Sequence, residues 1–205
     1  MFACIGNHTS MKRLLASLLA GLLLSGCGVT TPDYTAPQSS ASMDKTTVTL
    51  DESYDQAWEQ LINFTSSRFF AIDNYEKDSG LMTLSFSSEP GRFIDCGQIS
   101  TDGPPSCEGD YVQWFSERPA TLDLDGRMNL NVREVAQDQT EIDVNVRYVA
   151  TATGANGVQA AQWSFNTGGS DTQQVRANNF GATQTRTCQP THEAEEVIID
   201  GIRGI

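Results

Sequence analysis

Two long segments in the middle of the chain alternate apolar and polar residues. Residues 122–132 and 142–148 carry Leu, Met, Ile, Val or Tyr at nearly every second position, with Asp, Asn or Arg between them. This period of two predicts strands of an antiparallel sheet with one buried and one wet face. Shorter runs rich in β-branched or aromatic residues predict further strands at 45–50, 69–75, 81–86, 93–96, 158–165 and 184–188.

Apolar residues at helical spacing occur in two places. In the first, Asp51 can cap a helix whose apolar face runs from Tyr54 to Thr65. In the second, Thr191 can cap a helix whose apolar stripe begins at Ala194. The order of a strand, a helix, several antiparallel strands and a second helix predicts an α+β fold. We expect a single antiparallel sheet with an N-terminal and a C-terminal helix packed on one face.

The segments between these elements are polar. Residues 77–80 (KDSG) have turn chemistry and are expected to join two strands of a hairpin. Residues 97–110 are rich in Gly, Pro and acidic residues and predict a loop, as do residues 150–157. Residues 168–182 are polar and show no clear period.

The segment from Met11 to Cys27 has a different pattern. Lys12 and Arg13 precede an apolar run, Leu14–Leu24. The run is too short for a membrane-spanning helix, which needs about 20 residues, and it has the length of the apolar core of a secretory signal peptide. Because a complete signal begins at Met11, we expect residues 1–10 to lie upstream of the true start.

The last four residues of this segment, Leu24-Ser25-Gly26-Cys27, resemble the lipobox of bacterial lipoproteins. The resemblance implies cleavage before Cys27 and fatty acyl chains, such as palmitate, on its sulfur and new amino group. The following residue is Gly28 and not Asp. In lipoproteins of diderm bacteria this favours transfer to the outer membrane, where we expect the protein on the periplasmic face. A Gram-positive host remains an alternative.

Length and composition fit one soluble domain behind such an anchor. The chain has 205 residues, of which 39% are hydrophobic. Residues 1–26 are expected to be upstream residues plus signal peptide, and the Pro/Ser/Thr-rich residues 27–42 a flexible lipid-anchored linker. Residues 43–205 are expected to form the single α+β domain. With 13 Lys and Arg against 26 Asp and Glu, the net charge is −13. Nucleic acid is therefore not an expected partner, because phosphate neutralisation supplies most of that affinity.

Three cysteines remain if Cys27 is acylated. In an oxidising compartment, one disulfide and one free thiol among Cys96, Cys107 and Cys188 is the simplest outcome. We favour Cys96–Cys188, because both residues end predicted strands and the bridge closes the longer loop. Cys96–Cys107 is the alternative. With His192 these cysteines could supply four zinc ligands, but no CxxC pair is present and no metal is expected.

Motifs for catalysis are missing from the sequence. It has no G-x-S-x-G, Walker A or G-x-G-x-x-G pattern. His192 is the only histidine after Cys27, and we expect it to face solvent in the first turn of its helix. Asp123, Asp125 and Asp143 are interpreted as the wet face of the sheet. We therefore expect no enzyme and no cofactor other than the lipid on Cys27.

An aromatic segment follows the acidic loop at 97–110. Tyr111, Trp114 and Phe115 lie within six residues, directly beyond Asp110. Aromatic residues are enriched at the centres of protein interfaces. These three residues are therefore candidates for contacts with a partner protein, with core packing as the alternative.

A longer pattern carries a family resemblance. It comprises Tyr54-Asp55, Ala57-Trp58, Phe70, Ile72 and the turn Lys77–Thr83 (KDSGLMT). It resembles domains of the C-subunit lipoprotein of the outer-membrane β-barrel assembly machine and uncharacterised periplasmic lipoproteins. The resemblance covers about 35 residues and occurs once, whereas that subunit repeats its domain. It implies a strand and a Trp-containing helix before a hairpin, in an envelope lipoprotein.

These observations predict a lipid-anchored protein of the bacterial envelope. We expect a non-enzymatic interaction or accessory module that contacts the membrane through its anchor and an envelope protein through its domain. One alternative is a periplasmic binder of an apolar ligand or lipid, which would need an apolar cavity. Another is an envelope hydrolase that uses the acidic sheet face.

Overall fold

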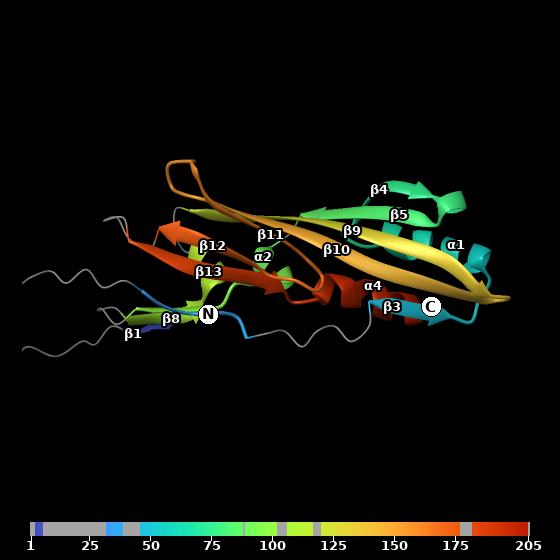
Figure 1. The fold of residues 1–205 in the computed structure, drawn as a ribbon, viewed down its shortest axis with the longest axis horizontal. Coiled ribbons are helices and arrows are strands. Elements are labelled where there is room, and N and C mark those ends of the chain that lie inside the picture. Colours follow the sequence, from blue (N-terminus) through green and yellow to red (C-terminus); the bar gives the residue numbers. More distant parts are fainter. Residues whose placement is uncertain are drawn as a thin grey trace, which may run out of the picture.

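The computed structural model describes residues 3–5, 32–38, 46–87, 89–101, 106–116, 120–176 and 182–204. In this part of the chain the fold is mostly β, with three sheets and four short α-helices (Figure 1). The expectation of one sheet with two helices on one face is therefore wrong. The strands of the largest sheet run along the long axis of the molecule, and the smaller sheets lie at one end (Figure 1).

The largest sheet has six strands. Its order is β11-β10-β9-β5-β4, and β3 pairs with the free half of β10 beside β11. All the pairings are antiparallel. The strands are β3 (Thr47–Leu50), β4 (Ala71–Glu76), β5 (Leu81–Ser87), β9 (Thr121–Ala136), β10 (Gln139–Thr153) and β11 (Gln159–Asn166).

Strands β9 and β10 form the spine of this sheet. They pair from Thr121↔Thr153 to the turn at Asp138, with one irregularity beside Gln139. Along most of β9 and β10 the even-numbered residues are buried and the odd-numbered ones are more exposed. The alternation predicted at 122–132 and 142–148 is confirmed, and it continues beyond both segments.

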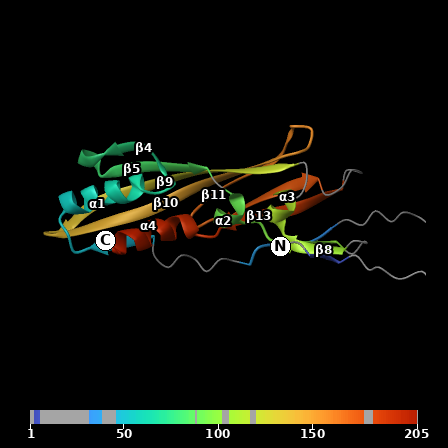
Figure 2. The ribbon, with the colours of Figure 1, turned by 180° about the vertical axis from the view of Figure 1, so that it is seen from behind.

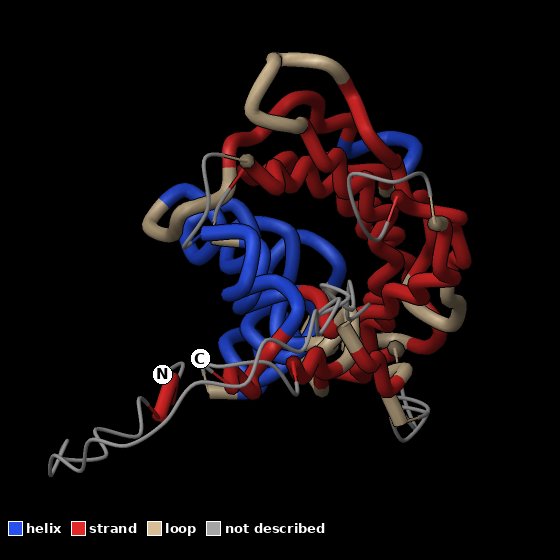
Figure 3. The backbone as a smooth tube through the Cα atoms, turned by 90° about the vertical axis from the view of Figure 1, so that its left-hand side faces the viewer, coloured by secondary structure: helices blue, strands red, loops and turns tan. Residues whose placement is uncertain are grey.

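Helices α1 (Tyr54–Ser66) and α4 (Glu193–Arg203) pack against each other and against the buried face of the spine. Figure 3 shows the strands curving around the helices. Leu61 of α1 and Ile198 of α4 are fully buried. The N-cap of α1 is Ser53, which forms a capping box with Gln56, and not Asp51. No helix among the described residues has the length and apolar content to cross a membrane.

The hairpin after α1 has the predicted turn. A short 3₁₀ helix, η1 (Lys77–Ser79), joins β4 to β5 and ends at Gly80, whose φ is 69°. This left-handed conformation favours glycine. A Cβ at position 80 would also lie 2.1 Å from the carbonyl oxygen of Val132 on β9, so the turn packs closely against the spine.

The sequence predicts the two smaller sheets only in part. The predicted strands at 93–96 and 184–188 correspond to two of their strands. The expectation of a loop at 97–110 is wrong, because two strands form there, and strands also form within the expected linker and within the polar residues 168–182.

One of the two smaller sheets has the order β1-β8-β7-β2 and the other β12-β13-β6. β12 buries only Val175, so its sequence carries no alternation that would reveal a strand. The strands are β1 (Ala3–Ile5), β2 (Asp33–Thr35), β6 (Ile94–Asp95), β7 (Gln98–Thr101), β8 (Ser106–Asp110), β12 (Asp171–Arg176) and β13 (Thr183–Pro190).

Two further helices connect the sheets. α2 (Pro90–Phe93) follows β5, and α3 (Tyr111–Ser116) follows β8. Both pack against β9 and against each other. Seen from behind, they lie beyond α4, in the half of the molecule away from the β9–β10 turn (Figure 2).

A disulfide ties this half together. Cys96 and Cys188 are bonded, with an S–S distance of 2.04 Å, and both side chains are fully buried. They lie next to the pairing of β6 with β13, at Gln189↔Asp95. Of the two pairings left open by the sequence, the structure forms the favoured one. Cys27 lies outside the described residues.

Replacing Cys96 and Cys188 with alanine should lower the free energy of unfolding by roughly 2–5 kcal/mol, because the bridge closes a long loop in the unfolded chain. Urea unfolding followed by tryptophan fluorescence measures the loss. A reductant should shift the wild-type midpoint in the same direction and leave the double variant unchanged. Equal midpoints for the two proteins without reductant would contradict the role of the bridge.

Candidate functional site

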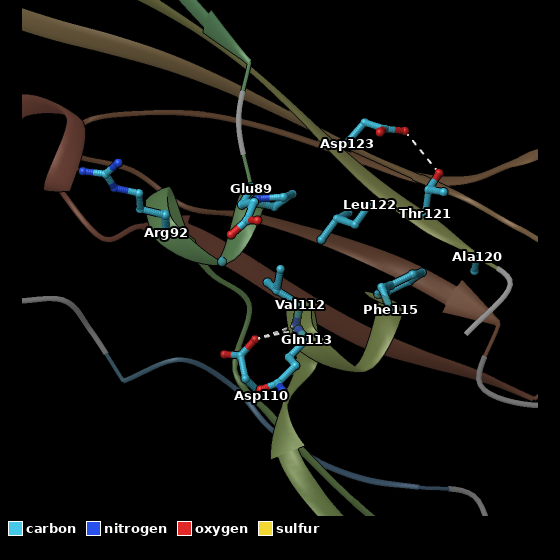
Figure 4. Close-up of a pocket in the computed structure, with 12 residues that line it drawn as sticks. Glu89, Arg92, Asp110, Val112, Gln113, Phe115, Ala120, Thr121, Leu122 and Asp123 are labelled. Atoms are coloured by element: carbon cyan, nitrogen blue, oxygen red, sulfur yellow. Dashed lines mark hydrogen bonds between the residues drawn. The ribbon is translucent and has the colours of Figure 1, made fainter. Parts of the chain in front are cut away.

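A groove opens between α2, α3 and the first residues of β9 (Figure 4). Its volume is about 800 Å³, which is within the range of binding sites. Its lining comes from three short segments: Glu89–Arg92, Asp110–Phe115 and Ala120–Asp123.

The groove exists because β9 is longer than its neighbour β5. Pairing between the two strands ends at Ser87↔Asp125, whereas β9 and β10 stay paired as far as Thr121↔Thr153. After β5 the chain turns away into α2, and α3 comes from the other side. Residues 121–123 of β9 therefore form one wall of the groove, and β10 is paired beside them.

The floor of the groove is apolar. Val112 and Phe115 come from α3, and Leu122 comes from β9. Each is mostly buried in the core, with Leu122 at 9% exposure. All three also line the groove, so an occupant would meet the edge of the hydrophobic core rather than a polar surface.

The rim of the groove is acidic. It carries the carboxylates of Glu89, Asp110 and Asp123, and one cation, Arg92. Arg92 is already engaged, because its Nε donates to Glu193 and its guanidinium lies 5.1 Å from the centre of the Phe93 ring. The rim is therefore net negative and suits a cationic group on an occupant.

Two of these acids hold local structure as well. The Asp110 carboxylate accepts the backbone N–H groups of Val112 (2.8 Å) and Gln113 (3.0 Å) and so caps α3. The Asp123 carboxylate accepts the hydroxyl of Thr121 at 3.2 Å (Figure 4). Both acids are held in place at the rim before anything binds.

The aromatic candidates have different positions. Only Phe115 lines the groove. Tyr111 is 3% exposed, and its ring stacks on Trp114 with centroids 5.9 Å apart. Burial raises the pKa of Tyr111 to about 12. Trp114 is partly buried against the core. The burial of Tyr111 favours the packing alternative for that residue, and the segment contributes to the groove mainly through Phe115 and Val112.

Asp123 and Asp143 of the sheet face do not form a pair. Asp123 lies opposite Thr151, which is eight residues from Asp143 along β10. Eight strand residues cover about 26 Å, far more than the separation of two carboxylates in a glycoside hydrolase. Asp143 instead accepts hydroxyl hydrogen bonds from Thr46 (3.2 Å) and Thr47 (3.1 Å).

A buried polar cluster lies where α4 meets β10. Tyr148 donates a hydrogen bond of 2.6 Å to Glu195 Oε2, and the other carboxyl oxygen is 3.9 Å from His192 Nδ1. Both Glu195 and Tyr148 are fully buried, and burial raises the pKa of Tyr148 above its ordinary value. The cluster lines none of the pockets described for these residues. We interpret it as a structural contact that fixes α4 to the spine.

The expectation that His192 faces solvent is wrong, because the residue is only 6% exposed. His192 is the N-cap of α4 and has a left-handed backbone, with a φ of 70°, which turns its side chain toward Glu195. Thr191 is therefore not the N-cap that the sequence predicts, although its hydroxyl accepts the N–H of Glu193 at 3.4 Å. Glu195 is one of three acids in the first turn of α4, with Glu193 and Glu196, and nothing in the sequence pattern distinguishes it from the other two.

No group of three or more His, Cys, Asp or Glu side chains within the described ranges could hold a metal ion. Comparison of the chain with protein-family models, with curated proteins and with solved structures found no match.

Replacing Tyr148 with phenylalanine should destabilise the fold by about 1–3 kcal/mol, because the buried Glu195 carboxyl loses its hydrogen-bond donor. Urea unfolding measures the change. Tyr75→Phe is the matched control, since Tyr75 is 59% exposed and should show no loss. Adding Glu195→Met to Tyr148→Phe should recover part of the stability, because no unpaired carboxyl remains. A Tyr148→Phe protein as stable as wild type would contradict this structural role.

Proposed function

We propose that the protein is a non-enzymatic interaction module of the bacterial envelope, anchored by lipid on Cys27 to the periplasmic face of the outer membrane. The groove between α2, α3 and β9 is its partner site. The observation that carries the proposal is the combination of an apolar floor with an acidic rim in that groove. The lipobox Leu24-Ser25-Gly26-Cys27 supports the anchor and the compartment.

The chemistry of the groove favours a protein segment as its occupant. Phe115 and Leu122 offer apolar contact, and Glu89 and Asp123 offer negative charge at its border. A partner segment with alternating apolar and basic side chains satisfies both. The net charge of −13 adds a long-range attraction for such a partner.

An apolar ligand or lipid has less support. The curved face of the large sheet, where a cavity would be expected, is covered by α1 and α4, and Leu61 and Ile198 are fully buried there. The groove itself is bordered by carboxylates, which an acyl chain would have to desolvate without a partner. The resemblance to the C-subunit lipoprotein of the β-barrel assembly machine supports the envelope compartment and names no partner.

Reversing two rim charges, Glu89→Lys with Asp123→Lys, should reduce capture of the partner by about tenfold or more, because like charges then face each other. The measurement is photo-crosslinking in living cells of the native host. A photoreactive amino acid replaces Gln113 in the groove, and the crosslinked partner is quantified after detergent extraction.

The matched control is Glu59→Lys with Glu134→Lys, which makes the same change in net charge on exposed positions of α1 and β9. It should leave the crosslink unchanged, and a photoreactive residue at position 59 should give none. Equal crosslinking in the rim and control variants would contradict a partner site in the groove.

A further inference from the structure

Residues 32–38 lie within the segment that the sequence analysis interpreted as a linker, yet they are fixed to the body of the protein. We call them the strap. Its strand β2 pairs with β7 over three residues, from Asp33↔Ser100 to Thr35↔Gln98. The strap therefore extends the sheet of β7 and β8 by one strand.

Tyr34 fastens the middle of the strap. Its hydroxyl donates to the carbonyl oxygen of Thr187 (3.1 Å) and accepts the N–H of the same residue (2.9 Å). The guanidinium of Arg186 lies 4.1 Å from the centre of the Tyr34 ring, and the ring meets Tyr111 edge to face at 6.0 Å. These contacts join the strap to residues more than 70 positions away in the sequence on β13 and α3.

Both ends of the strap are also held by β13. The side-chain amide of Gln184 donates to the carbonyl oxygen of Pro32 at 3.0 Å, and that of Gln189 donates to the carbonyl oxygen of Gln38 at 2.6 Å. The strap thus runs alongside β13 in the same direction. Pro32 lies beside the first residues of β13. That strand begins at the end of the molecule opposite the β9–β10 turn (Figure 1).

The body of the protein is shaped to receive the strap. Gly97 has a φ of 83°, and a Cβ there would lie 2.2 Å from the carbonyl oxygen of Thr35. Only glycine allows the backbone before β7 to pass this close to the strap. Arg186 is 2% exposed, and the Tyr34 and Tyr111 rings lie over its guanidinium, so undocking of the strap would expose a buried cation.

We propose that the strap fixes which end of the protein faces the membrane. The proposal rests on the lipid anchor at Cys27. Five residues lead from Cys27 to Pro32, and they reach at most about 18 Å. Without the strap, the free chain would run from Cys27 to Thr46 and reach about 65 Å. Docking therefore holds the outer end of β13 close to the lipid surface, and the β9–β10 turn points away from it.

This orientation also specifies the kind of partner that the groove can meet. The groove lies at the start of β9, and the turn beyond Ala136 is about 45 Å further along the strand. The groove therefore belongs to the half that the strap holds near the membrane. Its occupant is a segment of an envelope protein that is embedded in the same membrane or lies directly on it.

Fluorescence energy transfer to labelled lipid tests the orientation. The lipid-bearing protein is purified from membranes and reconstituted into phosphatidylethanolamine/phosphatidylglycerol vesicles that carry an acceptor on the headgroups. A bioorthogonal donor is placed at Thr183, the first residue of β13, or at Gln137 in the β9–β10 turn. Transfer from position 183 should exceed transfer from 137 by about threefold or more, because the start of β13 and the β9–β10 turn lie at opposite ends of the molecule (Figure 1).

Tyr34→Ala should remove most of this difference in energy transfer between positions 183 and 137, because release of the strap lengthens the chain between the lipid and the folded domain. Tyr75→Ala is the matched control, since it removes an exposed tyrosine and should leave the difference unchanged. If Tyr34→Ala lowers the unfolding midpoint, a second variant, Gln184→Ala with Gln189→Ala, replaces it. This variant releases the ends of the strap, leaves Tyr34 in place and should also reduce the difference in energy transfer.

Flotation of the vesicles separates the two proposals. A protein that carries no lipid and does not float overturns the anchor and, with it, the orientation. A protein that floats but transfers equally from both positions overturns the strap as an orienting device and leaves the anchor intact. Unequal transfer that Tyr34→Ala and the paired glutamine variant both fail to change also overturns the role of the strap.

Discussion

The burial of one face of the β9–β10 ribbon is the constraint on which the rest of this structure depends. The two strands are paired along almost their whole length, and their even-numbered side chains supply 11 of the 35 buried residues in the core cluster of the described residues. Neither strand can bury that face alone. α1 and α4 cover it near the turn, and α2, α3 and the smaller sheets cover the other half. Each remaining element is placed by the need to exclude water from one long apolar surface.

The polar groups that this packing buries explain how the parts are joined. Glu195 would be costly to bury without Tyr148 as a donor, so α4 is fixed at one position on β10. Arg186 has no carboxylate partner among the ion pairs of the described residues, and the rings of Tyr34 and Tyr111 lie beside it instead. A segment near the N-terminal side of the domain thereby becomes part of the same core region as β13. The strap and the fold stabilise each other.

The sequence predicts the parts of the fold whose residues carry their own pattern. The alternation around Met128 and Val144, the helical faces of α1 and α4 and the turn at Gly80 all follow from local rules. The strands β7, β8 and β12 do not, because they lie in small sheets with few buried positions and so carry no clear alternation of apolar and polar residues. For the same reason the expectation of one sheet is wrong, whereas the favoured cysteine pair is formed.

The candidate site was predictable only in outline. The aromatic segment Tyr111–Phe115 pointed to the right region, but its burial and the acids opposite it depend on where α2 and β9 lie. The strap was missed because its flanking residues have linker composition. One signal was present in the sequence. Tyr34 is the only aromatic residue within residues 27–42, and the next aromatic residues along the chain are Tyr54, Trp58 and Phe64. An aromatic residue in a Pro/Ser/Thr-rich segment is a reason to look for a docking contact.

The proposed function and orientation of the protein depend most on the lipid anchor, and the mass of the intact protein tests this anchor most directly. The protein would be extracted with detergent from the membranes of its native host and measured by mass spectrometry without reduction. We expect the mass of residues 27–205 with two or three fatty acyl chains, less two hydrogens for the Cys96–Cys188 bridge. A mass that corresponds to a chain beginning at Met1 or Met11, with no added lipid, would contradict the account.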